Sequence, residues 1–134
     1  MLDKIGLITI ITNNLPKMKQ FYSEVLNFKC IEDLGSYVEF KNKGVRFALT
    51  TTDVMYEGTE NPSYKEENKG HAFELAFPLP SPEEVGKVYD EIIAKGATAI
   101  KAPELMPWGR MTAFFADPDG NIHELYNLRE DEKT

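Results

Sequence analysis

The chain lacks several sequence features that are typical of particular classes of protein. It holds a single cysteine, Cys30, so it can form neither an intramolecular disulfide nor a cysteine metal cluster. Its longest apolar runs fall far short of the roughly 20 residues that cross a bilayer. The opening residues have neither the basic stretch nor the small-residue cleavage site of a signal peptide, so we expect a cytoplasmic protein.

Positive charge is also scarce. Lys and Arg total 15 against 22 Asp and Glu, which gives a formal net charge of −7. Because nucleic-acid-binding domains need a basic stripe, this balance argues against a nucleic-acid partner. With 134 residues, of which 42% are hydrophobic, the chain is long enough to bury the core of one ordinary domain. We therefore expect a single domain over residues 1–134 that binds neither nucleic acid nor membrane.

One order of predicted elements occurs twice along the chain. Apolar β-branched runs predict strands, and apolar residues at helical spacing predict a helix in each half. The first half is predicted to hold a strand at 5–12, a helix at 15–27, and strands at 28–32, 37–40 and 45–50. The second is predicted to hold a strand at 72–77, a helix at 82–95, and strands at 98–101, 112–116 and 122–126.

Two polar segments lie outside these modules. Residues 51–69 carry Gly58 and Asn61-Pro62, so we interpret them as a long loop between modules at about 4–50 and 70–127. The charged tail, residues 129–134, is expected to fray.

The halves can be aligned residue by residue. The predicted helices align at an offset of 67, and the last strands align at 76, which places Ala48 on Glu124. At the first strands, Gly6-Leu7 matches Gly70-His71 at an offset of 64. The alignment therefore predicts that His71 and Glu124 stand where the first half has Leu7 and Ala48.

Four groups of residues in this order resemble the vicinal oxygen chelate superfamily, also called the glyoxalase/bleomycin-resistance/extradiol-dioxygenase fold, over about residues 4–127. They are Asn14-Leu15 ahead of Phe21-Tyr22, Gly70-His71, Met106-Pro107-Trp108-Gly109, and the run from Asp117-Pro118-Asp119-Gly120 to Leu125. The resemblance implies an α+β fold in which two tandem βαβββ modules form a curved mixed-sheet half-barrel cleft with the helices outside.

The resemblance also implies where a metal ion would be held. In metal-using members each module supplies two ligands from its first and last strands, and these positions here are Leu7, Ala48, His71 and Glu124. Histidine and glutamate are suitable ligands for Zn, Ni, Mn or Fe, but catalytic zinc and non-haem iron sites normally have three protein ligands. Since Leu7 and Ala48 cannot ligate, we expect a degenerate metal site.

His71 and Glu124 are the candidate catalytic residues. Without a metal, the carboxylate can orient the imidazole, and the pair can act as a general base or bind a polar ligand. The alternative is a structural histidine that bonds to backbone. Strand alternation predicts that Phe73 and Tyr126 line the same cleft face. Glu74 is then expected on the opposite, helix-facing side.

Four further candidates and three residues interpreted as structural complete the set. Arg46 alternates with Ala48, so it is expected to pair with Glu124, hold an anionic ligand or extend into solvent. Met106, Trp108 and Arg110 are expected either to form a ligand wall or to lock a turn. His123 and the acidic residues of Asp117-Pro118-Asp119-Gly120 are interpreted as structural, the latter as a turn.

Three functions remain open on this sequence. The first is a glyoxalase/bleomycin-resistance-like protein that binds a small molecule in the cleft between its modules. The second is a divalent-metal-dependent lyase, isomerase or dioxygenase of the glyoxalase type, and the third is a partner-binding domain with a vestigial cleft. The resemblance also implies a homodimer.

Overall fold

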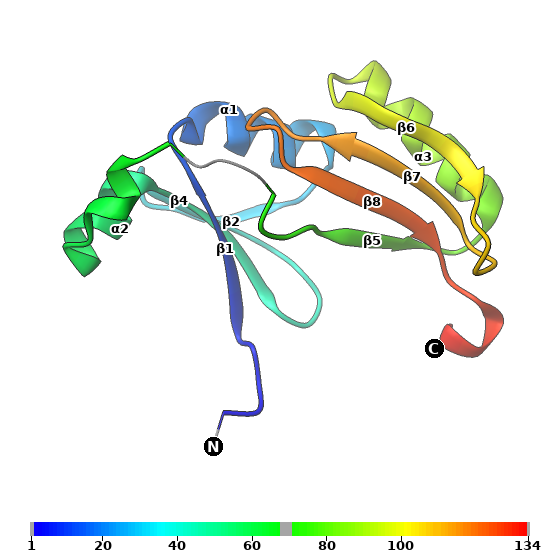
Figure 1. Cartoon of the computed structure of the whole chain (residues 1–134), viewed down its shortest axis with the longest axis horizontal. Coiled ribbons are helices and arrows are strands. Elements are labelled where there is room, and N and C mark those ends of the chain that lie inside the picture. Colours follow the sequence, from blue (N-terminus) through cyan, green and yellow to red (C-terminus); the bar gives the residue numbers. More distant parts are fainter. Residues whose placement is uncertain (1, 68–70, 134) are drawn as a thin grey trace. The chain divides into compact units, whose positions relative to one another are not determined.

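The structure is a computed structural model that describes residues 2–67 and 71–133. The chain divides into two compact units, Met1–Lys69 and Gly70–Thr134, and each contains one four-stranded mixed sheet with helices (Figure 1). The fold class is therefore α+β, as the sequence predicts. Within the described ranges, no helix has both the length and the apolar character needed to cross a membrane.

The first unit has the sheet order β1-β4-β3-β2. Strands β1 and β4 are parallel, and the other neighbours are antiparallel. Its elements are β1 (Leu7–Thr12), α1 (Leu15–Gln20), η1 (Phe21–Val25), β2 (Cys30–Asp33), β3 (Tyr37–Phe40), β4 (Arg46–Thr51), α2 (Thr52–Thr59) and η2 (Pro62–Lys65).

An aromatic cluster forms the core of this unit. Pro16 lies in the first turn of α1, where its missing N–H leaves no helical bond unmade, and the helix continues into the π-helical turn η1. Tyr22 of η1 is fully buried, and its ring centre lies 5.3 Å from that of Phe47 and 6.2 Å from that of Phe40. These rings fix the helical segment against β3 and β4.

The second unit repeats the arrangement with the sheet order β5-β8-β7-β6. Its elements are β5 (Ala76–Leu79), α3 (Pro82–Ala94), β6 (Thr98–Leu105), β7 (Met111–Ala116), β8 (Ile122–Asn127) and η3 (Glu130–Glu132). Helix α3 runs along β6 and β7 (Figure 1). The hydroxyl of Ser81 caps this helix by accepting a hydrogen bond from the N–H of Glu84 at 3.3 Å. Gly96 follows the helix with φ +121°, a conformation that favours glycine.

Two segments expected to be irregular are ordered. Within residues 51–67, α2 begins where the hydroxyl of Thr51 accepts a hydrogen bond from the N–H of Val54, and η2 follows; the predicted loop is wrong for this part. Residues 68 and 69 of that loop lie outside the described residues. The tail also forms η3, because Glu132 bonds to the backbone N–H of Arg129 at 2.8 Å.

The first strand of the second unit begins later than predicted. Residues 71–75 have no strand conformation, and β5 includes Pro78. A proline cannot donate a ladder hydrogen bond, but β5 is an edge strand, where that loss is tolerated. The prediction from the apolar run at 72–77 therefore placed this strand too early in the sequence.

This shift changes how the two units correspond. Strand β1 ends at Thr12 and β5 ends at Leu79, an offset of 67, and α1 and α3 begin at the same offset. Strands β4 and β8 keep the predicted offset of 76. The predicted offset of 64 for the first strands is wrong, so the residue that corresponds to Leu7 is Glu74 rather than His71.

Candidate functional site

Glu124 lies in the middle of β8, and the strand register defines which residues share its side of the sheet. Ala76 of β5 and Phe114 of β7 stand directly beside it. Tyr126 and Thr112 form the next pair along the same two strands. We call these five residues, together with Glu74, the Glu124 face.

Glu74 belongs to this face because its charge acts on Glu124. Burial of the Glu124 carboxyl raises its pKa, and the nearby Glu74 carboxylate raises it further, whereas Arg110 acts in the opposite direction. The sequence placed Glu74 on the helix-facing side, which is wrong. Just before β5 the backbone still runs beside β8, since the N–H of Glu124 donates to the backbone oxygen of Leu75 at 2.9 Å, and Phe73 lies against His123 on the opposite side, so Glu74 falls on the side of Ala76 and Glu124. Two carboxyl groups therefore share one face.

His71 and Phe73 do not extend this face as expected. His71 is exposed and lies outside any strand, and among the described residues no hydrogen bond joins it to Glu124. The Phe73 ring centre lies 6.2 Å from that of His123, a residue of the opposite side of β8, so the predicted alternation of Phe73 with Glu124 is wrong. The catalytic role of His71 and Glu124 stays a prediction.

The opposite side of β8 is structural. His123 is fully buried; its Nδ1 accepts a hydrogen bond from the N–H of Leu75, and its Nε2 lies 3.3 Å from Asp117 Oδ2. The Asp117 carboxylate also accepts hydrogen bonds from the N–H groups of Asp119 and Asn121, both at 3.0 Å. His123 thus ties the strand to the turn, which agrees with its interpretation as a structural residue on the opposite side from Glu124.

In the first unit, Arg46 forms a polar cluster that sequence reasoning missed. Its guanidinium binds Glu39 of β3 through two hydrogen bonds, of 2.9 and 2.7 Å, and the hydroxyl of Tyr37 donates to the same carboxylate at 2.8 Å. These bonds lower the pKa of Glu39 to about 2, with the Arg46 hydrogen bond as the largest cause. Arg46 is thus paired with Glu39, which stands opposite Ala48 in the neighbouring strand, and its pairing with Glu124 stays a prediction.

The donor set does not fit the metal centre that the family resemblance implies. By register the four positions are Leu7, Ala48, Glu74 and Glu124, of which only the two glutamates can ligate. In residues 2–67 and 71–133, no three His, Cys, Asp or Glu side chains come together in a way that could hold a metal ion. Catalytic zinc and non-haem iron sites require a third protein ligand, normally with nitrogen donors.

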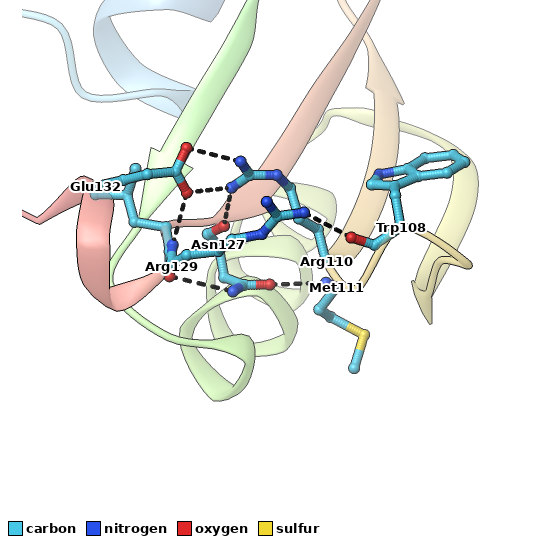
Figure 2. A network of polar contacts seen from close by, with 7 residues as sticks. Trp108, Arg110, Met111, Asn127, Arg129 and Glu132 are labelled. Carbon is cyan, nitrogen blue, oxygen red and sulfur yellow. Dashed lines mark hydrogen bonds and ion pairs between the residues drawn. The ribbon is translucent and has the colours of Figure 1, made fainter.

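The 106–110 turn forms a clasp on the C-terminal segment (Figure 2). Arg110 donates two hydrogen bonds to the Glu132 carboxylate, both of 2.7 Å, and one to the backbone oxygen of Asn127 at 2.9 Å. Arg129 donates to the backbone oxygen of Trp108 at 2.6 Å. These bonds explain why the turn and the tail are both ordered.

The residues of the 106–110 turn differ in their exposure and contacts. Arg110 lies over the Tyr126 ring, 5.3 Å from its centre, and so reaches the edge of the Glu124 face. Trp108 is 57% exposed, and Met106 is half-buried with its N–H bonded to the backbone oxygen of Arg110. Ligand binding by these residues stays a prediction.

Thr112 is the second feature of the Glu124 face that the sequence did not reveal. The residue is 2% exposed, and its hydroxyl has no hydrogen-bond partner among the described residues. A buried hydroxyl without a partner is costly, so such groups are rare in native proteins and each needs a specific explanation. A lone threonine in an apolar strand gives no signal of this in the sequence.

The fold and this face together define a two-module α+β domain with a polar patch on its second sheet. Residues 4–125 match the model of the Glyoxalase/Bleomycin resistance protein/Dioxygenase superfamily. The chain therefore belongs to this superfamily.

Relatives share the whole domain. The Bacillus subtilis (strain 168) protein named Uncharacterized protein YraH is 29% identical over 130 residues, covering 93% of this chain and 98% of the relative. A crystal structure of a glyoxalase/bleomycin resistance protein/dioxygenase from Nocardioides has a TM-score of 0.85 and 26% identity, over 99% of this chain and 88% of the other. A family enzyme from Burkholderia phytofirmans PsJN has a TM-score of 0.82 and 26% identity, over 92% and 98%.

Proposed function

We propose that the protein binds a small molecule through the Glu124 face, without the four-ligand metal centre of its metal-using relatives. The observation that carries this proposal is the placement of Glu74 and Glu124 on one face, where burial and the nearby Glu74 carboxylate make the charge of Glu124 less favourable. A ligand that donates hydrogen bonds or carries positive charge relieves this repulsion. Natural proteins retain such unfavourable groups mainly at functional sites.

The neighbouring side chains support the same kind of ligand. Phe114 and Tyr126 offer aromatic surface beside the carboxyls. Apolar surface with a few polar groups is the usual composition of small-molecule sites. Arg110 limits the negative charge of the face without removing it.

A thermal-shift screen of small amines, amides and polyols tests the proposal. A ligand at one hundred times its Kd adds about 2.7 kcal/mol of stability and so raises Tm measurably. We expect Glu124→Gln and Glu74→Gln each to weaken the binding of a ligand found in this screen by at least about tenfold, a loss of ~1.4 kcal/mol of binding free energy. Glu91→Gln is the matched control, since Glu91 is exposed on α3. Hits that bind both site variants as tightly as the wild type would refute the assignment.

A metal-dependent lyase, isomerase or dioxygenase is the second candidate, because Glu74 and Glu124 present oxygen donors at two of the implied ligand positions. Elemental analysis of protein purified without chelator separates the two. Under our proposal we expect no stoichiometric metal and an unchanged Tm with added Zn, Ni or Mn. Stoichiometric metal that is lost in Glu74→Gln or Glu124→Gln would instead support the metal-dependent activity.

We also propose that the protein is a cytoplasmic homodimer. The resemblance to the family and the single cysteine, Cys30, support this assembly and this compartment. Gel filtration with light scattering tests the assembly, and a mass near the chain's 15.2 kDa would contradict it. If the thermal-shift screen finds no ligand, the partner-binding domain remains as the candidate function.

A further inference from the structure

Residues 51–67, which the sequence indicates as a loop, build a hollow against β1. Its volume is about 420 Å3, and it is lined by Ile11, Thr52, Ser63, Tyr64, Glu66 and Glu67. We call it the α2–η2 pocket. It contains no residue of the Glu124 face, and its volume falls within the roughly 300–1,000 Å3 of small-molecule sites.

The walls of the pocket are fixed by local hydrogen bonds. The hydroxyl of Thr52 bonds to the side chain of Asn13, which attaches the start of α2 to the end of β1. Glu60 ends the helix in the left-handed region at φ 57°, and Asn61 Oδ1 accepts a hydrogen bond from the N–H of Ser63 at 2.9 Å to begin η2. The pocket is thus preformed although α2 and η2 bury no residue.

The lining combines apolar surface with polar groups. Ile11 lines the pocket and is 38% exposed, and Tyr64 contributes a half-buried aromatic ring. Exposed apolar side chains of this size at the base of a hollow gain free energy when a ligand covers them. Thr52 and Ser63 supply hydroxyls, so a ligand with a mainly apolar body and few polar atoms matches the lining.

The charge of the lining is negative. Glu66 and Glu67 are exposed carboxylates, and within the part of the chain that the structure describes neither forms an ion pair. Lys65, the cation between Tyr64 and Glu66, instead places its ammonium 4.1 Å from the centre of the Tyr56 ring. The lining therefore presents two carboxylates and no cation.

We propose that the α2–η2 pocket is a second binding site, which takes a monovalent organic cation with an apolar body. Ile11 and Tyr64 contact the apolar part, and Glu66 and Glu67 attract the cationic group. Tyr64 adds an aromatic face, which favours quaternary and primary ammonium groups. The formal net charge of −7 makes the approach of such a ligand favourable at low ionic strength.

An NMR titration of the full, 15N-labelled chain with benzyltrimethylammonium chloride tests the site. We expect saturating shifts of the amides of Ile11, Ser63 and Tyr64. Substituting Glu66→Gln together with Glu67→Gln should weaken binding by about tenfold, since two Coulomb attractions are lost. Glu57→Gln with Glu60→Gln is the matched control, because it removes the same charge from α2 and its end outside the pocket. It should change Kd by less than about twofold.

Three results would overturn the proposal. One is the absence of localised shifts up to about 20 mM probe, a Kd too weak for a specific site. Another is equal binding of the neutral probe benzyl alcohol, which would make the carboxylates irrelevant. The third is tighter binding of Ca2+ at the same amides, which would indicate a metal site. Glu124→Gln leaves this pocket intact, so the variant should bind benzyltrimethylammonium as the wild type does. The proposals for this pocket and for the Glu124 face can therefore be refuted independently of each other.

Discussion

Thr12 of β1 and Thr112 of β7 are both 2% exposed, but their hydroxyls have different surroundings. The hydroxyl of Thr12 accepts a hydrogen bond from the N–H of Asn14 at 2.9 Å, whereas that of Thr112 has no partner in the described part of the chain. A buried unsatisfied polar group costs about 1–3 kcal/mol, and a satisfied one stabilises by about 1 kcal/mol. The same substitution should therefore have opposite effects at the two sites.

We predict that Thr112→Val raises the free energy of unfolding by about 1 kcal/mol, because a methyl group replaces the unpaired hydroxyl. Thr12→Val, the matched control, should lower it by about 1 kcal/mol, because the N–H of Asn14 loses its acceptor. Urea unfolding at neutral pH measures both. Destabilisation by Thr112→Val would mean that its hydroxyl is satisfied, for example by ordered water.

The residues of the Glu124 face were only partly predictable from the sequence. Glu124 and Tyr126 were assigned to one side because strand alternation within β8 is reliable once the strand itself is found. Glu74 was assigned to the wrong side because the alternation was counted from His71, which is outside the strand. The partner of Arg46 was missed because cross-strand pairs depend on register, which a single sequence does not state.

At the scale of elements, strand β3 matches the predicted range 37–40, whereas α2 and β5 do not match. Strand β3 lies between two clear turns, so the sequence pattern left little choice for where the strand begins and ends. Helix α2 buries no residue, so it has no apolar stripe from which to predict it. Strand β5 contains Pro78, which in a sequence argues for a turn unless the strand is known to be an edge.

The two helix starts make an element-scale prediction possible. Ser81 caps α3 through its hydroxyl, whereas Asn14 precedes α1 without a side-chain capping bond. We predict that Ser81→Ala lowers the free energy of unfolding by about 1 kcal/mol and that Ser81→Gly lowers it by only a few tenths. Asn14→Ala is the control and should have a smaller effect than Ser81→Ala. Equal losses in chemical denaturation at the two sites would contradict the capping assignment.

At the scale of the whole molecule, the repeat explains both what was predicted and what was not. Two matching modules indicated the α+β fold through the order of their elements, and four groups of residues in sequence order indicated the superfamily. The functional comparison of the modules depended on one offset, and matching Gly6-Leu7 to Gly70-His71 gave 64 instead of 67. Glycine pairs recur by chance, whereas helix starts are constrained by packing, so the helix offset was the better guide.

Each unit also holds a carboxyl that is paired with an arginine, Glu39 in the first and Glu132 in the second. Hydrogen bonds from Arg46 and Arg110, respectively, lower the pKa of each to about 2, from an ordinary value of 4.5. A carboxyl with a lowered folded-state pKa contributes stability above its ordinary pKa and loses it as the pH falls toward the folded value. Both contributions should therefore be lost between pH 4.5 and about 2.

We predict that the Glu39→Gln/Glu132→Gln double variant is less stable than the wild type at pH 7 and that this difference shrinks as the pH falls from 4.5 toward about 2. In that range unfolding of the wild type should take up about one proton for each carboxyl more than unfolding of the variant, seen as a steeper pH dependence of the unfolding free energy. Glu57→Gln/Glu91→Gln is the control, since both of these residues are exposed, one in each unit. It removes the same charge, so if its pH dependence equalled that of the double variant, net charge rather than the two arginine pairs would govern acid stability.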